Sequence, residues 1–331
     1  MTRAAVLGAG SWGTALANHL AAVGHDVRLW ARDASLVRDM QARRANAVYL
    51  PDVTLPPRVR PMADLAGALD GAEFVVCAVP SHGVRLVMQA AAPHLRPQAI
   101  VVSATKGLEE DTLLRVSELL AQVLQHDHPI VVLSGPSFAA ELAREHPTAV
   151  CVASHDAAAV GRVQAEFRSP WLRLYASDDV VGVEIGGALK NVIAIAAGVV
   201  EGLGIGQNAQ AALITRGLAE IGRLALALGA RRETLAGLSG LGDLVLTCTG
   251  SFSRNRHVGV ELARGRPLAE IVGGMKMVAE GVRTTTAALA LGSRHGVELP
   301  IATQMAEVLE GRKDVRTAIA DLMLRPQRSE G

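Results

Sequence analysis

Three glycines near the start of the chain restrict its fold more than any other feature. Gly8, Gly10 and Gly13 form a G-x-G-x-x-G pattern between an apolar run at Ala4–Gly8 and a helical pattern at Thr14–Val23. In such a strand–turn–helix unit the glycines permit a tight turn, close approach of a pyrophosphate and close helix packing. A flexible turn is the alternative in a chain with 33 glycines. The position between strand and helix favours a dinucleotide site.

The first half of the chain alternates short apolar runs with helical patterns. The candidate strands are Ala4–Gly8, Asp26–Trp30, Phe74–Val79, Ala99–Ser103, Ile130–Leu133, Ala149–Ala153 and Leu172–Tyr175. Several are apolar throughout, which is typical of strands buried on both faces of a parallel sheet. The alternation predicts an α/β fold, a Rossmann-type doubly wound parallel sheet with right-handed crossovers.

The pattern changes after Ser177, where helical periodicity takes over. The helical candidates are Val180–Glu201, Ala209–Leu228, Arg254–Ala263, Gly281–His295 and Ile301–Glu310. We therefore expect a dinucleotide-binding domain at residues 1–178 and an all-α, substrate-binding domain at 179–331, with a ligand cleft between them. The apolar helices of the second domain are compatible with a homodimer.

Charge and cysteine content argue against several classes of protein. The chain has 33 basic and 32 acidic residues with no long run of one sign, so a nucleic-acid partner is not expected. Its three cysteines, Cys77, Cys151 and Cys248, are odd in number and widely spaced. This pattern argues against a disulfide framework and a structural zinc site, so we expect no metal and a reducing, cytoplasmic setting.

No segment has the pattern of a leader or a membrane span. The stretch Met1–Val23 carries Arg3 as its one early charge and is interrupted by glycines, unlike a signal peptide. The closest candidate for a span, Val192–Val200, is much shorter than the ~20 apolar residues that a bilayer requires.

The end of the second predicted strand bears on the choice of cofactor. An NAD site usually places an acidic residue there to bind the ribose, whereas an arginine suits the 2′-phosphate of NADP. Arg32 stands at this point and Asp33 follows it. Arg32 therefore favours NADP, although it could be a solvated surface residue, and Asp33 keeps NAD open.

Lysine is rare in this chain, with four lysines among the 33 Lys and Arg residues. A lysine can lose its proton in a buried site, whereas an arginine stays charged. Lys190 is the only ionisable residue in Gly186–Ala197. Burial would lower its pKa toward the range that general acid–base catalysis needs. The alternative, a lysine that snorkels from a helix end, suits a position inside the helix less well.

The other three lysines differ in context. Lys106 follows the strand Ala99–Ser103, at the edge of a parallel sheet where ligands bind, although a simple loop lysine is the alternative. Lys276 and Lys313 stand in ordinary polar surroundings, and we expect Lys313 to be solvated.

Five ordered segments carry a resemblance to a known family. They are SGPSFA at Ser134–Ala139, GVEIGGALKN at Gly182–Asn191, AALITRGLAE at Ala211–Glu220, LGDLVLTCTGSFSRNR at Leu241–Arg256, and Glu280–Gly281. Together they resemble the bacterial NAD(P)-dependent glycerol-3-phosphate dehydrogenase family over nearly the whole chain. The histidine often seen before Tyr49 in that family is absent, which weakens a cofactor role for Tyr49.

The resemblance implies reversible hydride transfer between NAD(P)H and dihydroxyacetone phosphate, giving sn-glycerol 3-phosphate for glycerophospholipid synthesis. It implies Lys190 as the general acid–base group, with Asp243 beside it. The implied substrate-binding residues are Lys106, Gly135, Ser137, Lys190, Asp243, Ser253, Arg254 and Asn255. The implied cofactor-binding residues are Gly8, Gly10, Ser11, Trp12, Gly13, Arg32, Lys106, Ala139, Arg254, Val278 and Glu280.

Elementary chemistry supports part of this assignment. Ser253, Arg254 and Asn255 open a predicted helix, where free N–H groups and a guanidinium suit a phosphate. Ordinary capping is the alternative for Ser253 and also for Asp243. His82 is read as a loop residue. Two rival functions remain: a related reductase of hydroxy acids or sugar acids, and a non-catalytic dinucleotide sensor.

Overall fold

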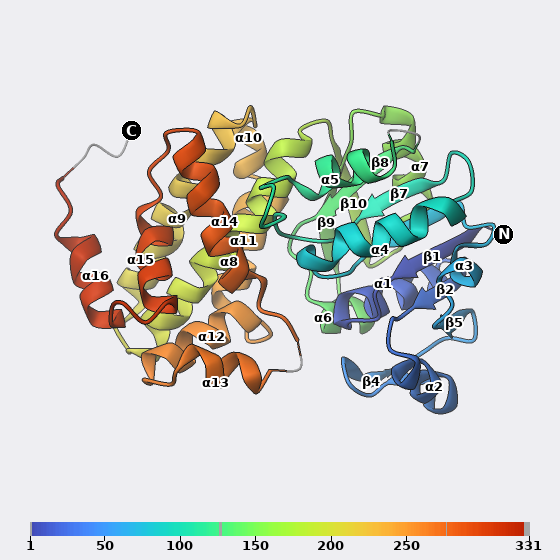
Figure 1. Cartoon of the computed structure of the whole chain (residues 1–331), viewed down its shortest axis with the longest axis horizontal. Coiled ribbons are helices and arrows are strands. Elements are labelled where there is room, and N and C mark those ends of the chain that lie inside the picture. The colour runs from blue at the N-terminus through green and yellow to red at the C-terminus, as the bar shows by residue number, and fades with distance from the viewer. Residues whose placement is uncertain (1, 126–127, 276, 328–331) are drawn as a thin grey trace.

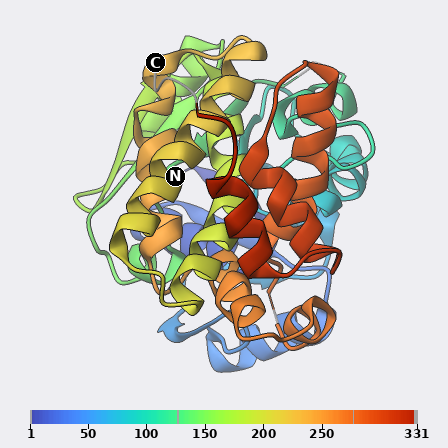
Figure 2. The same cartoon turned by 90° about the vertical axis from the view of Figure 1, so that its left-hand side faces the viewer.

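A computed structural model describes residues 2–125, 128–275 and 277–327, so Lys276 lies outside the described residues. The chain forms a sheet flanked by helices up to Ser177 and a body of helices from Val180 onward, placed side by side (Figure 1). Figure 2 views the molecule from the helical side, with the sheet behind it.

The described residues of the first part of the chain form ten strands. They are β1 Arg3–Leu7, β2 Asp26–Trp30, β3 Ala45–Asn46, β4 Leu50–Thr54, β5 Val59–Met62, β6 Phe74–Cys77, β7 Ile100–Ser103, β8 Ile130–Ser134, β9 Thr148–Ala153 and β10 Leu172–Ser177. Eight form one sheet in the order β10-β9-β8-β7-β6-β1-β2-β5, and β3 pairs with β4 separately. The order reverses between β1 and β6, which is where doubly wound sheets bind ligands.

Each of the seven predicted strands is present, with ends shifted by up to two residues. The sequence patterns missed β3, β4 and β5. Of these, β5 reads Val-Arg-Pro-Met and pairs on one side only, with β2. A strand with an exposed arginine and a proline fits the edge of a sheet, and such a strand lacks the apolar pattern that marks a central one.

The predicted doubly wound parallel sheet is confirmed with one exception at β9, which runs antiparallel to β8. The chain between them contains one short helix, α6 Ala139–Ala143. At 1.5 Å per residue this helix spans about 7 Å, too short to return the chain to the opposite edge of the sheet. The next strand, β10, is again parallel to β9 because α7 Ala157–Phe167 provides a full crossover.

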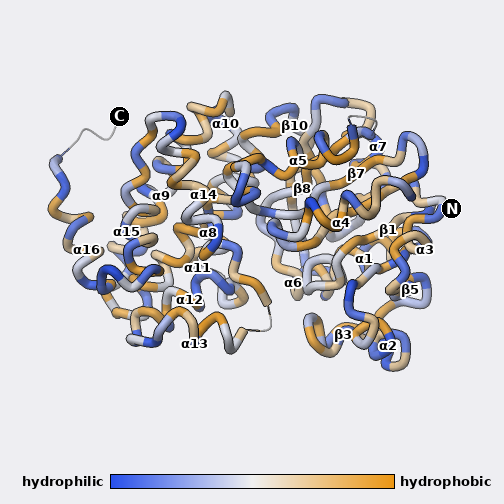
Figure 3. Tube along the Cα trace, viewed as in Figure 1, coloured by the Kyte–Doolittle hydropathy of each residue, from blue (hydrophilic) through white to orange (hydrophobic). Residues whose placement is uncertain are grey.

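Helices cover both faces of the sheet. They are α1 Ser11–Ala22, α2 Ala34–Arg43, α3 Leu65–Leu69, α4 Val84–Ala91, α5 Val116–Val123, α6 and α7, with 3-10 turns at Ser81–Gly83 and Ala92–His94. One core contains Leu16 and Leu20 of α1 and Phe167 of α7, and the other contains Met88 of α4 and Leu119 of α5. The central strands between these cores are buried and hydrophobic (Figure 3).

The second part of the described chain is helical. Its helices are α8 Val180–Gly202, α9 Gln207–Ala227, α10 Arg232–Leu235, α11 Asp243–Thr249, α12 Arg254–Ala263, α13 Leu268–Gly273, α14 Glu280–Arg294, α15 Pro300–Leu309 and α16 Val315–Met323, with a π-helical turn at Leu238–Gly242. The five predicted helices are present to within two residues. Lys313, which we expected to be solvated, is partly exposed and donates to Asp321 at 2.6 Å and to Gln304 at 2.8 Å.

Helix α8 is the centre of the helical part and packs against α9, α11, α12 and α14. It has 23 residues, longer than the apolar run at Val192–Val200 suggested. By length and composition it is the one unbroken helix among the described residues that could cross a membrane. However, 94% of its most apolar 18-residue stretch is buried inside the protein. Other helices of the protein therefore take the place that lipid would occupy around a span.

Glycines set the crossing of α8 and α12. A Cβ atom on Gly198 of α8 would lie 1.9 Å from the carbonyl oxygen of Arg256. A Cβ atom on Gly259 of α12 would lie 1.9 Å from the carbonyl oxygen of Ile195. The two backbones are thus in direct contact, and α12 is held at a fixed height along α8.

Candidate active site

The glycine loop has the geometry that a dinucleotide requires. Gly8 has a φ of +109°, and a Cβ there would lie 2.8 Å from the carbonyl oxygen of Ala78. A Cβ on Gly13 would lie 1.8 Å from the carbonyl oxygen of Gly8. Gly10 differs, because a Cβ there would meet no atom within 4 Å. It precedes α1, whose first N–H groups have no side-chain cap. This open space beside free N–H groups fits a pyrophosphate.

Residues within the loop contact other parts of the chain. The Ser11 hydroxyl lies 2.6 Å from the carbonyl oxygen of Tyr49 and 2.9 Å from the sulfur of Met277. The indole N–H of Trp12 is buried without a hydrogen-bond partner in the described part of the chain. Met277 belongs to the segment before α14, so the glycine loop and the helical part approach each other here.

The two residues after β2 have different surroundings. Asp33 caps α2, since its carboxylate accepts hydrogen bonds from the N–H groups of Ser35 at 2.8 Å and Leu36 at 3.3 Å. Arg32 is exposed. The carboxylate that kept NAD open is thus engaged with its own helix.

Two lysines from different elements bind one carboxylate between the two parts of the molecule. Lys190 of α8 places Nζ 2.5 Å from Oδ1 of Asp243, and Lys106, which follows β7, places Nζ 2.7 Å from Oδ2. Asp243 is 1% exposed and Lys190 6% exposed. Two ammonium groups on one carboxylate leave a net positive charge, which favours an anionic substrate.

Thr247 completes this cluster, and the sequence analysis missed it. Its hydroxyl donates to the carbonyl oxygen of Asp243 at 2.6 Å, which leaves a lone pair to accept from Lys190 Nζ at 2.8 Å. Thr247 lies one helical turn after Asp243 on α11. The spacing of four residues could have indicated it, because residues i and i+4 share a helix face.

Glycine in the GVEIGGALKN segment brings Asp243 to Lys190. A Cβ on Gly186, one turn before Lys190 on α8, would lie 2.6 Å from the carbonyl oxygen of Ser239. Ser239 belongs to the π-helical turn Leu238–Gly242, which leads directly into Asp243 at the start of α11. The small residue lets this turn lie against α8.

The surroundings tune Lys190. The pKa of Lys190 is lowered to about 7, chiefly by burial; the Asp243 carboxylate opposes this shift and the neighbouring Lys106 ammonium adds to it. A lysine with this pKa holds comparable amounts of its acid and base forms near neutral pH. The expectation that Lys190 is buried is therefore confirmed, and its role in proton transfer stays a prediction.

Lys106 also contacts the loop after β8. Its ammonium donates to the carbonyl oxygen of Gly135 at 2.8 Å and lies 3.5 Å from the Ser137 hydroxyl. Gly135 has a φ of +140°, a conformation that favours glycine. Ala139 begins the short helix α6 two residues after Ser137. The loop therefore borders the lysine cluster, and its role in binding substrate stays a prediction.

The start of α12 contains three further predicted residues. The Ser253 hydroxyl accepts from the N–H of Arg256 at 3.2 Å, so Ser253 is the helix cap that the alternative interpretation described. Arg254 donates to the carbonyl oxygen of Val278 at 2.6 Å. This contact joins the predicted phosphate segment to the segment before α14.

Asn255 has structural partners on both sides of its amide. Its Nδ2 donates to Oδ1 of Asn191 at 2.9 Å, and its Oδ1 accepts from the N–H of Gly281 at 2.9 Å. Asn191 directly follows Lys190 on α8. What Asn255 can offer a ligand is therefore its second amide N–H.

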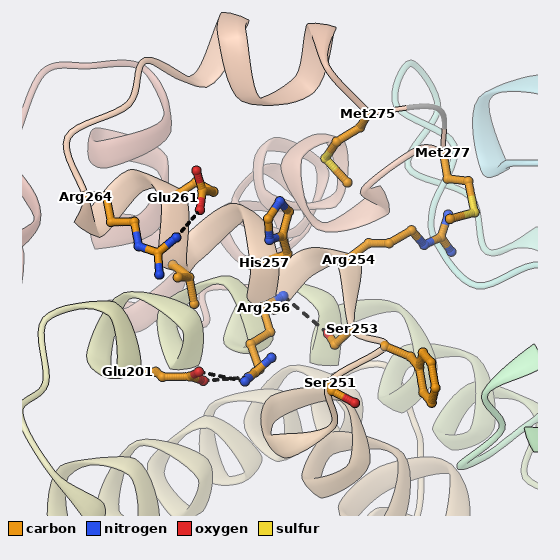
Figure 4. Close-up of a pocket in the computed structure, with 12 residues that line it drawn as sticks. Glu201, Ser251, Ser253, Arg254, Arg256, His257, Glu261, Arg264, Met275 and Met277 are labelled. Carbon is orange, nitrogen blue, oxygen red and sulfur yellow. Dashed lines mark hydrogen bonds and ion pairs between the residues drawn. The ribbon is translucent and has the colours of Figure 1, made fainter. Parts of the chain in front are cut away.

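A pocket of about 430 Å³ flanks this site on the side of α12 (Figure 4). It is lined by Glu201, Ser251, Phe252, Ser253, Arg254, Arg256, His257, Val260, Glu261, Arg264, Met275 and Met277. Arg256 pairs with Glu201 and Arg264 with Glu261. Within the described residues Arg254 has no such carboxylate partner and points toward Met277 (Figure 4). Lys190 does not line this pocket.

Glu280 links the two parts of the molecule. Its carboxylate accepts hydrogen bonds from the N–H of Ser81 at 3.2 Å and from the Ser81 hydroxyl at 2.7 Å. A Cβ on Gly107, next to Lys106, would lie 2.8 Å from Cβ of Ser81. The neighbouring His82 is exposed.

Across the described residues no cluster of three or more His, Cys, Asp or Glu side chains suits a metal ion.

Comparison with known proteins assigns a family to this arrangement. The model of the NAD-dependent glycerol-3-phosphate dehydrogenase N-terminus matches residues 3–160, and that of the C-terminus matches residues 179–320. The chain belongs to this family.

Named members of the glycerol-3-phosphate dehydrogenase family are similar over their whole length. An enzyme of Citrifermentans bemidjiense is 52% identical over 99% of this chain and 98% of its own. One from Myxococcus xanthus is also 52% identical, again over 99% and 98%. Both are named glycerol-3-phosphate dehydrogenase [NAD(P)+]. A crystal structure of glycerol-3-phosphate dehydrogenase from Coxiella burnetii has a TM-score of 0.95 and 40% identity, covering 98% of this chain and 99% of the other.

Membership of the dehydrogenase family confirms the resemblance and the α/β-plus-helical fold class. It also fits the nicotinamide cofactor, for which the space at Gly10 supplies a structural reason. The roles of the individual residues remain predictions.

Proposed function

We propose that this chain is a glycerol-3-phosphate dehydrogenase that interconverts dihydroxyacetone phosphate and sn-glycerol 3-phosphate. The observation that carries the proposal is the buried Lys190–Asp243 pair with Lys106 on the other carboxylate oxygen. Alone, the G-x-G-x-x-G loop would fit many reductases, whereas an acid–base lysine in a net-positive site fits reduction of an anionic ketone. A non-catalytic sensor has no use for such a lysine.

In reduction of the ketone, Lys190 donates a proton to the C2 oxygen, and in oxidation its neutral amine removes the proton of the C2 hydroxyl. Asp243 and Thr247 hold the Nζ atom in place through contacts of 2.5 and 2.8 Å. A bound nicotinamide cofactor supplies or accepts the hydride. Fixed orientation of the acid and the substrate accounts for much of the rate in such a site.

The remaining predicted substrate residues lie on two sides of this pair. Lys106, with Gly135 and Ser137 beside it, would bind the glycerol end. Ser253, Arg254 and Asn255 would bind the phosphate. Arg254 is the best placed of these three, because among the described residues it forms no ion pair and arginine binds phosphate in a bidentate manner. The Glu280 carboxylate is the charge that bears on the pKa of Arg254.

The residues that would hold the cofactor extend from the glycine loop to the helical part. They are Gly8, Gly10, Ser11, Trp12, Gly13, Arg32, Lys106, Ala139, Arg254, Val278 and Glu280. We infer a modest preference for NADPH over NADH, because Arg32 is exposed and Asp33 is engaged as a helix cap.

We further propose the setting of the enzyme. Residues 1–178 would bind the dinucleotide and residues 179–331 the substrate, in a homodimer. Its product would serve glycerophospholipid synthesis in the cytoplasm, which agrees with three buried, unpaired thiols.

The direct test is the absorbance decrease of NADPH, and in parallel of NADH, with dihydroxyacetone phosphate as substrate. We expect rapid oxidation that requires the phosphate, since dihydroxyacetone alone lacks the group that Arg254 would bind. Oxidation of NADPH or NADH by the keto acid that corresponds to a hydroxy acid, but not by dihydroxyacetone phosphate, would favour the rival reductase. No oxidation by folded protein that binds NADPH would favour the sensor.

A further inference from the structure

Glu184 is a buried carboxylate for which the chemistry above has no use. It lies on α8 six residues before Lys190 and is 6% exposed. Its oxygens accept three hydrogen bonds, from Nη1 of Arg115 at 2.6 Å and from the N–H and hydroxyl of Ser117 at 2.8 and 2.6 Å. Arg115 and Ser117 stand at the start of α5, so the contact joins the helical part to the sheet.

The segment between β7 and α5 connects this contact to the active site. It contains Lys106 near its start and ends with Arg115. Leu108 forms a β-bridge with Arg115, and the N–H of Glu109 donates to the carbonyl oxygen of Leu114 at 3.0 Å. The segment is therefore a closed loop. Arg115 at its far end pairs with Leu108, which lies two positions after Lys106.

The loop also packs on the helical part rather than only on the sheet. Leu108 is 2% exposed and belongs to the core that contains Leu189 and Val192 of α8. An exposed ion pair between Glu110 and Arg283 of α14 adds a second tie at 2.9 Å. Exposed pairs contribute little, whereas removal of one partner from a buried, hydrogen-bonded pair is strongly destabilising.

We propose that Glu184 is a positioning residue for this reaction: by holding Arg115 and Ser117, it fixes the loop that places the Lys106 ammonium on the Asp243 carboxylate beside Lys190. Helix α8 then determines the positions of both lysines, because it contains Lys190 and also Glu184, which holds the loop of Lys106. The proposal rests on the function proposed above, because it assigns Glu184 a role through Lys106.

The proposal gives a signature that a loss of stability alone would not produce. The charged groups that bear on the pKa of Lys190 are Asp243, which raises it, and Lys106, which lowers it. Cys248 stays a neutral thiol, because burial raises its pKa to about 12. If Lys106 moves away from Asp243, the pKa of Lys190 rises, and ketone reduction keeps its acid form to higher pH.

The test compares Glu184→Gln with Glu110→Gln in the full chain. Glutamine keeps the size of Glu184 but removes the charge that pairs with Arg115. We expect kcat for dihydroxyacetone phosphate reduction to fall by about tenfold to a hundredfold, since displacement of a catalytic group by about 1 Å has this cost. We also expect the alkaline limb of kcat to move to higher pH. Glu110→Gln, in the exposed tie of the same loop, should leave both quantities unchanged.

A double-mutant cycle with Lys106→Met separates action through Lys106 from a general defect. We expect Glu184→Gln to cost nothing further in kcat when Lys106 is already absent. Two effects that multiply, or a fall in kcat with an unmoved alkaline limb, would overturn the proposal. Absence of dihydroxyacetone phosphate reduction in the unmodified protein would instead overturn the proposed function.

Ser117→Ala provides the second variant if Glu184→Gln does not fold. It removes one donor to Glu184 and leaves the Arg115 pair in place. We expect a fall in kcat of about threefold to tenfold, the effect of one lost hydrogen bond, with the same direction of the pH shift. An unchanged alkaline limb in this variant would count against the proposal.

Discussion

Lys106 and Lys190 donate to opposite oxygens of one buried carboxylate, that of Asp243. One lysine follows a strand of the sheet and the other lies on the central helix of the second part. Their shared contact with Asp243 therefore depends on how the two parts of the molecule are placed relative to each other. It also makes each lysine part of the electrostatic environment of the other, and several measurable consequences follow.

Replacement of Lys190 by methionine keeps much of the length of the side chain and removes the proton. We expect Lys190→Met to lower kcat by about two or more decades, the usual contribution of a general acid. The Kd for NADPH, measured by fluorescence titration, should stay close to that of the unmodified protein. Turnover near the normal rate would remove Lys190 from the proton transfer.

The pKa of Lys190, lowered by burial to about 7, predicts opposite pH profiles for the two directions. Ketone reduction needs the ammonium form, so its kcat should fall as pH rises through about 7. Oxidation of glycerol 3-phosphate needs the neutral amine, so its kcat should rise over the same range. Initial rates in both directions from pH 5.5 to 9 check this, and profiles that move together would contradict it.

Thr247 gives Lys190 its second acceptor, at 2.8 Å. We expect Thr247→Val, which keeps the shape and removes the hydroxyl, to lower kcat by about tenfold, in line with the loss of a hydrogen bond to a charged group. Thr247→Ser retains the hydroxyl and is the matched control, with kcat close to normal. Equal rates in the two variants would show that the hydroxyl has no part in holding Lys190.

Arg254 is the guanidinium that we expect to bind the phosphate. Arg254→Ala should raise the KM for dihydroxyacetone phosphate by about tenfold to a hundredfold, the cost of a lost hydrogen bond to a charged group. Arg256→Ala is the control, because Arg256 pairs with Glu201 instead. Initial-rate kinetics at saturating NADPH measure both, and a KM that rises equally in the two variants would argue against a specific phosphate contact.

The contact of α8 with α12 should be intolerant of a single methyl group. A Cβ on Gly198 would lie 1.9 Å from a backbone oxygen, so we expect Gly198→Ala to lower the free energy of unfolding by about 1–3 kcal/mol. Gly222 of α9 has no atom within 4 Å of its Cβ position. Gly222→Ala should therefore raise the free energy of unfolding by about 0.5–1 kcal/mol. Urea denaturation followed by circular dichroism distinguishes the two.

Local patterns were sufficient for much of the molecule. The glycine loop between β1 and α1 could be recognised from sequence because its three glycines are required by the backbone geometry of a few neighbouring residues. The buried strands and α8 could be predicted from their continuous apolar runs. Lys190 stood out because it is alone among apolar neighbours, and burial then acts on its pKa wherever the partners come from.

Contacts between distant segments decided the rest. The antiparallel β9 depends on how far a five-residue helix can carry the chain, and the edge strand β5 has no apolar pattern to mark it. The sequence by itself determined the loop chemistry, the class of each main element and the choice of Lys190 as the proposed acid–base group. Only the tertiary structure placed Lys106 and Thr247 around it and joined Glu184 to the loop of Lys106. Side chains far apart in sequence become neighbours through glycine-sized contacts that no local pattern encodes.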